Sequence, residues 1–165
     1  MAPLANHSLI YLDGDPSAYK RFKTHVVEVG VATLSGAVGA LVAYAAIIAP
    51  DTYASSSLAA LPTLAVLLLG IVHMLAGALV LLGLLVTRRD VAAEIHTEQF
   101  GWIGASAGWL GFGWCMWYFA EGSTVTVVLG AILGTVSALR AVFLVEIEDQ
   151  ARARLARPPE PGIVQ

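Results

Sequence analysis

Long apolar runs dominate this chain and set the strongest limit on what it can fold into. The runs cover residues 26–48, 58–86, 100–119 and 125–145, and most polar residues lie between them. A helix of about 20 apolar residues crosses the roughly 30 Å of hydrocarbon in a bilayer. In a chain of 165 residues, four such runs leave room for little else. The sequence therefore predicts an all-α membrane protein, a bundle of four transmembrane helices.

Composition argues against a water-soluble domain. Hydrophobic residues make up 58% of the chain and charged residues 13%, which is more apolar side chain than a soluble core of this size can hide. The formal net charge is -3 and the cations stand in short groups, so we expect no nucleic-acid-binding surface. The single cysteine, Cys115, rules out an intramolecular disulfide framework and a thiolate metal cage.

The polar segments divide the chain into three parts. Residues 1–24 form a predicted cytoplasmic segment, in which Pro16 is expected to begin a short surface helix. Residues 25–145 form the transmembrane domain, and its polar stretch at 87–99 is predicted to be a loop in water. Residues 146–165 are predicted to continue the last helix into the cytoplasm and to end in a proline-rich tail.

The distribution of cations predicts the orientation. All nine Lys and Arg residues precede the first run, separate the second from the third, or lie at and after the inner end of the fourth. Cytoplasmic loops carry an excess of cations, so both termini are expected in the cytoplasm. The short links at 49–57 and 120–124 each force neighbouring helices to run antiparallel. The prediction is a multi-pass protein of the cytoplasmic membrane, N-in and C-in, built from two antiparallel hairpins.

Aromatic residues gather at the two expected ends of the third helix. Trp and Tyr side chains are enriched at membrane interfaces, where an apolar ring and a polar group meet lipid and water together. The sequence therefore predicts an outer belt and an inner edge of interfacial side chains. The outer belt contains Trp114, Trp117, Tyr118 and Phe119, and the inner edge contains Phe100 and Trp102.

Three ionisable residues, Glu28, His73 and Arg140, fall inside the predicted spans. Such residues are the first candidates for function, because a charge in hydrocarbon costs several kcal/mol. Glu28 and Arg140 lie at similar predicted depths, so they either pair across the bundle or reach separately to the inner interface. A pair would fix the register of the helices rather than move protons.

His73 lies near the middle of the second span, far from water. The favoured interpretation is a neutral imidazole that is hydrogen-bonded to a hydroxyl or a carbonyl group of a neighbouring helix. A proton relay would need more carboxylates at that depth. A haem would need a second axial ligand, for which Met74 and Met116 are weak candidates.

Pairs of small residues four positions apart mark expected helix-packing faces. They are Ser35 with Gly39, Gly104 with Gly108, and Gly130 with Gly134. Small side chains let helix backbones approach closely in lipid, where packing holds helices together. The pairs predict a compact bundle or an oligomer without choosing between them.

The sequence contains no recognised enzymatic motif. It has no phosphate-binding Walker loop, nucleophile elbow, HExxH pattern or dinucleotide fingerprint. We therefore expect no catalytic residues, no cofactor and no metal, and a role that is not enzymatic.

Several short stretches stand out beside the apolar runs: Ala49-Pro50-Asp51-Thr52-Tyr53, Gly101-Trp102, Gly108-Trp109, and Val145-Glu146-Ile147-Glu148-Asp149 after Arg140. In these stretches the chain resembles a family of four-span membrane proteins that phages of actinobacteria encode and that are described as holin-like. The resemblance implies a protein that accumulates in the host cytoplasmic membrane and oligomerises. It would open the membrane to a lytic enzyme or dissipate the membrane potential. The family often carries tryptophan at the position of His73.

Three functional hypotheses follow. The first is a holin-like or lysis-associated protein that acts as a homo-oligomer in the lipid bilayer. The second is a non-catalytic subunit that packs against other membrane protein subunits of a larger complex. The third is a small redox protein in which His73 binds haem. None of the three involves nucleic acid.

Overall fold

Four long helices make up the computed structural model, which describes residues 25–48, 58, 61–86, 91–119 and 124–155. The helices are α3 (Val26–Ile47), α4 (Thr63–Leu85), α5 (Val91–Phe119) and α6 (Thr124–Leu155). The prediction of an all-helical chain is confirmed for the described residues. Three helices are long and apolar enough to cross a membrane: α3, α4 and the Thr124–Gln150 part of α6.

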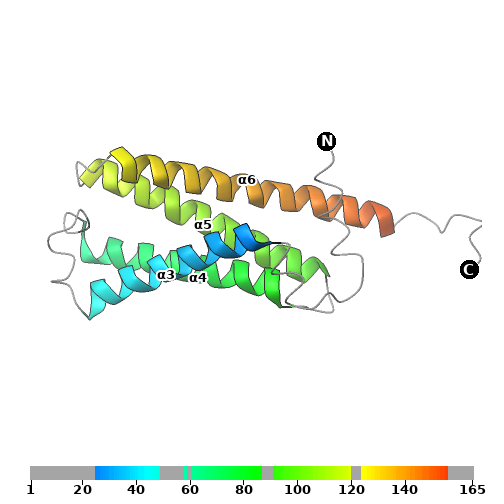
Figure 1. Ribbon diagram of the computed structural model, residues 1–165, viewed down its shortest axis with the longest axis horizontal. Helices are drawn as coiled ribbons and strands as arrows, with labels where there is room; N and C mark the ends of the chain where they lie inside the picture. The colour runs from blue at the N-terminus through cyan, green and yellow to red at the C-terminus, as the bar shows by residue number, and fades with distance from the viewer. Residues whose placement is uncertain (1–24, 49–57, 59–60, 87–90, 120–123, 156–165) are drawn as a thin grey trace, which may run out of the picture.

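The helices pack in the order in which the chain visits them. Extended backbone contacts join α3 to α4, α4 to α5, and α5 to α6 (Figure 1). Successive helices run in opposite directions, and α6 projects beyond its neighbours at its C-terminal end (Figure 1). We call the end where α3 and α5 begin the Arg140 end, and the opposite end of the bundle the far end.

Glycines bring the backbones of α3 and α4 into contact. A Cβ atom added to Gly39 would lie 2.6 Å from the carbonyl oxygen of Gly70, and one added to Gly77 would lie 2.5 Å from that of Ala32. These neighbours are backbone atoms, which cannot rotate away as a side chain can. A side chain at Gly39 or Gly77 would therefore push the two helices apart.

The other two helix pairs meet through glycines as well. Between α4 and α5, a Cβ atom on Gly104 would lie 3.2 Å from that of Ala76, and one on Gly108 would lie 2.9 Å from the His73 ring. Between α5 and α6, a Cβ atom on Gly130 would lie 2.9 Å from the Trp109 carbonyl oxygen, and one on Gly134 would meet Leu110. Each helix pair thus includes at least one glycine of the predicted packing faces.

Large apolar side chains cover the outward surface of every helix. Examples are Val27 on α3, Leu64 on α4, Phe100 on α5 and Val125 on α6, each more than half exposed. In water such a surface would drive aggregation, whereas lipid tails cover it at no cost. Buried apolar side chains fill the interior, in a main cluster shared by all four helices and a second cluster at the far end, around Ala46, Leu61 and Val66.

The start of α5 differs from the prediction. Residues 91–99 are its first turns, so the expected water-exposed loop at 87–99 is wrong for this part, and Glu94, Ile95 and Glu98 are buried. A hydropathy pattern assigns such charged residues to water, but Glu98 has a partner inside the bundle. The predicted segment 1–24 with its helix from Pro16, the loop 49–57 and the proline-rich tail lie outside the described residues.

Candidate functional site

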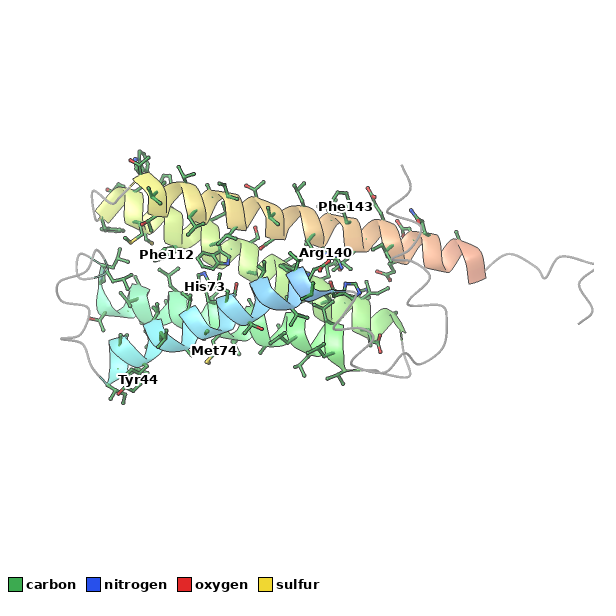
Figure 2. The ribbon with its side chains drawn as sticks, viewed as in Figure 1. Tyr44, His73, Met74, Phe112, Arg140 and Phe143 are labelled. Carbon is green, nitrogen blue, oxygen red and sulfur yellow. The ribbon has the colours of Figure 1, made fainter. Side chains whose placement is uncertain are left out.

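Arg140 connects three helices near one end of the bundle. Its Nη2 atom donates a hydrogen bond to Glu98 Oε1 on α5 at 3.1 Å and lies 3.8 Å from Glu28 Oε1 on α3. The Glu98 side chain has 0% of its surface exposed, against 21% for Glu28. Figure 2 shows Arg140 between α6 and the beginning of α3. By distance and by burial, the main partner of Arg140 is Glu98, a residue that the sequence interpretation placed in water.

Glu98 is held by its own helix as well. Trp102 Nε1, one turn further along α5, donates a hydrogen bond to the same Glu98 Oε1 at 3.1 Å. The carboxylate therefore accepts one hydrogen bond from a charged donor and one from a neutral donor, which offsets part of its desolvation cost. The Trp102 indole is buried inside the bundle, whereas Phe100, the other aromatic residue predicted at the inner edge of this span, is exposed.

A spacing of four residues explains this inner face of α5. Glu94, Glu98 and Trp102 recur every fourth position, which places them on one side of a helix. That pattern was visible in the sequence, where two carboxylates lead into an apolar run on a single face. The polar composition of 87–99 favours a loop instead, so composition and spacing give opposite predictions for this segment.

A hydrogen bond also ties α5 to α6 beyond Arg140. His96 Nε2 lies 3.1 Å from Glu148 Oε2, and His25 Nδ1 lies 3.6 Å from Glu28 Oε1 on α3. His96 is half exposed, so its bond to Glu148 is weakened by solvent. The buried contact between Glu98 and Arg140 is the stronger tie between the two helices.

A hydrogen bond in the middle of the bundle joins α5 to α3. Trp109 Nε1 donates to Ser35 Oγ at 2.9 Å, and both residues are buried. Ser35 was predicted as a small packing residue, and it also serves as a hydrogen-bond acceptor. The Trp109 ring meets the His73 ring edge to face, with centroids 4.8 Å apart and an angle of 89° between the rings.

His73 finds its hydrogen bond on its own helix. Its Nδ1 atom lies 2.8 Å from the carbonyl oxygen of Leu69, one turn earlier in α4. A partner on a neighbouring helix was predicted, but the carbonyl four residues back lies within reach of the imidazole. Because a carbonyl oxygen can only accept, Nδ1 carries a proton, and in the neutral imidazole Nε2 then holds a lone pair.

The surroundings of His73 do not fit haem. Figure 2 shows His73 pointing from α4 toward α5 near Phe112, while Met74 points away from it. The α5 backbone lies so near that a Cβ atom added to Gly108 would be 2.9 Å from the imidazole ring and 3.1 Å from its Nε2 atom. A haem at Nε2 would have to displace α5. Within the described residues, no group of three or more His, Cys, Asp or Glu side chains is placed to hold a metal ion.

Comparison with protein-family models, with curated proteins and with solved structures finds no match to this chain. The polar cluster of Glu28, Glu98, Trp102 and Arg140 links three helices. Its chemistry suits holding helices together.

Proposed function

We propose that this chain is a four-span integral membrane protein of phage type, holin-like or lysis-associated, that acts by assembling with copies of itself in the cytoplasmic membrane. In this proposal the spans form two antiparallel hairpins, with both termini in the cytoplasm. The distribution of the nine Lys and Arg residues supports that orientation.

The packing of α5 supports a fourth span. α5 contacts α4 from Glu98 to Gly108 and contacts α6 at Gly113, so it lies against two helices that are long and apolar enough to cross a membrane. A helix packed along two such neighbours crosses the bilayer with them. Glycines and tryptophans lower the apolarity of residues 99–119, but that stretch contains no charged residue.

An open apolar recess on the outward side of α5 and α6 supports self-association most directly. The recess has a volume of about 490 Å³ and is bounded by small residues and two indoles: Leu110, Gly111, Gly113, Trp114, Cys115, Trp117, Val127 and Ala131. In lipid, helices associate where small residues allow close approach. An apolar helix of a second copy is the occupant that this surface fits, because the chain has abundant apolar helix faces of its own.

Expression in a bacterial host with a potential-sensitive dye tests the proposal. The unmodified chain is expected to collapse the membrane potential at a defined time after induction, and to form cross-linked multimers in the membrane. Continued growth with an unchanged potential would contradict the function. A chain that copurifies in mild detergent with an unrelated protein, and not with itself, would favour the structural-subunit hypothesis instead.

A pair of matched variants tests the recess. Ala131 is exposed inside the recess and Ala40 is exposed on α3 outside it. Ala131→Leu is expected to fill the recess, reduce multimer cross-linking and delay the loss of potential, whereas Ala40→Leu adds the same side chain to a different face and should change neither. Equal behaviour of the two variants would show that another surface mediates assembly.

A further inference from the structure

Three buried polar atoms lack a hydrogen-bond partner among the described residues: His73 Nε2, Ser137 Oγ and Arg140 Nε. His73 is 3% exposed and Ser137 is 0% exposed. The helical turns around each of them, on all four helices, fall within the described ranges. An unpaired polar group in an apolar interior costs several kcal/mol, so each atom needs a donor or acceptor from another source.

The three atoms follow one another along the bundle. Ser137 and Arg140 are three residues apart on α6, which corresponds to about 4.5 Å along the helix axis. His73 lies opposite Gly108 on α5, and Leu110, two residues from Gly108, lies against Gly134 on α6. The level of His73 is therefore within about one helical turn of Ser137, on the side away from Arg140.

The rest of the polar interior lies in the same half of the bundle. Glu98 accepts from Arg140 at the Arg140 end, and Trp109 donates to Ser35 near the middle. Beyond His73 the interior is apolar, with Val66, Leu61 and Ala46 packed at the far end. The core thus changes from polar to apolar at the depth of His73.

The chemistry of the three atoms identifies what they bind. His73 Nε2 holds a lone pair and can only accept a hydrogen bond, Arg140 Nε–H can only donate one, and the Ser137 hydroxyl does both. Water is the small molecule that donates and accepts at successive positions, and buried water characteristically bonds to polar groups that protein atoms leave unpaired.

We propose that bound water enters the bundle from the Arg140 end and extends through Ser137 to His73, where it stops. In this arrangement a water molecule donates to His73 Nε2, and water links the Ser137 hydroxyl to Arg140 Nε. Water thus reaches about half the depth of the bundle, and the apolar far end closes the path. The inference does not depend on self-association, because all three atoms belong to one copy.

Cysteine labelling tests the path in a Cys115→Ser background in lipid vesicles. A thiol reacts with a methanethiosulfonate reagent as the thiolate, which forms only where water reaches it. Ser137→Cys is expected to react at least about tenfold faster than Val66→Cys, although both positions are 0% exposed in the structure. Equal rates would overturn the proposal. This result is independent of multimer formation and of the membrane potential, so it fails or holds separately from the proposed function.

The unmodified protein gives a second measurement that requires no substitution in the core. Val72-His73 is the single Val-His pair in the sequence, so ¹³C-carbonyl valine combined with ¹⁵N-histidine selects the His73 signal in solid-state NMR. In bilayers, magnetisation from water is expected to reach His73 Nε2 rapidly, and Nδ1 should show a bonded proton. A His73 imidazole that receives no magnetisation from water would contradict the proposal even if the cysteine variants failed to fold.

Discussion

Removing the Glu98 carboxylate is the sharpest test of the polar cluster. In Glu98→Ala, Arg140 loses its 3.1 Å partner and keeps Glu28 at 3.8 Å, while the buried Trp102 N–H loses its acceptor. Breaking a buried ion pair by deleting one partner costs about 3–5 kcal/mol. Because Arg140 keeps 15% of its surface exposed, we expect a loss near the lower end, about 3 kcal/mol.

Glu28→Ala is the matched control, since it removes the other carboxylate beside the same guanidinium. The Glu28 contact is longer and 21% of that side chain is exposed, so we expect a loss of about 1 kcal/mol or less. Glu98→Gln should fall between the two, because the amide oxygen can still accept from Trp102 while the charge is gone. The measurement is unfolding by SDS in mixed micelles, followed by helical circular dichroism, because replacing Glu98 removes the hydrogen-bond partner of Trp102 and would alter a tryptophan fluorescence signal directly.

Two results would refute this reasoning. The first is a Glu28→Ala variant that is as unstable as Glu98→Ala. The second concerns the double variant Glu98→Ala/Arg140→Leu, which lacks the unpaired charge and should recover part of the lost free energy of unfolding. If the double variant were instead less stable than Glu98→Ala by about another 3 kcal/mol, the unpaired guanidinium would not be the cause of the loss.

Three further predictions follow from other contacts. Gly39→Ala places a Cβ atom 2.6 Å from a carbonyl oxygen of α4 and should lower the free energy of unfolding by about 1–3 kcal/mol in the same SDS titration. Gly30→Ala is the control: a Cβ atom there has nothing within 4 Å, so the variant should be neutral or more stable by up to about 1 kcal/mol. Trp109→Phe removes the donor to a buried hydroxyl and should cost about 1 kcal/mol, so a variant as stable as the parent would show that this bond is dispensable. In a chain without its native cysteine, Ser56→Cys should react with an impermeant maleimide from outside the cell and Ala92→Cys from inside, and outside labelling of Ala92→Cys would reverse the proposed orientation.

Local sequence pattern predicted where the helices form. The apolar run at 26–48 became α3 (Val26–Ile47), and the run from 125 continued without a break as α6 to Leu155. These features depend on residues close in the chain, whose apolarity and spacing can be read directly. The early start of α5 at Val91 was missed, because it depends on where the carboxylates find partners.

The polar contacts could not be read from local pattern for the same reason. Glu98 and Arg140 are 42 positions apart, and Trp109 and Ser35 are 74 apart. Hydropathy assigns each residue to water or lipid separately, whereas a charge is stable inside a bundle when a distant residue neutralises it. The predicted depths along the helices did place Glu28 and Arg140 near one another. They could not show that Glu98, rather than Glu28, is the main partner of Arg140.

The glycine contacts between helices also affect how the bundle can move. Two helix faces that meet backbone to backbone, as α5 does at Gly101 against Val80 of α4, present little relief in which side chains could interlock. Such faces resist separation in lipid but offer low resistance to sliding along their common axis. The register between the α3–α4 hairpin and the α5–α6 hairpin then depends on a few directional contacts, Trp109 with Ser35 and Arg140 with Glu28. Loss of these bonds is expected to let the hairpins shift past one another while each remains helical.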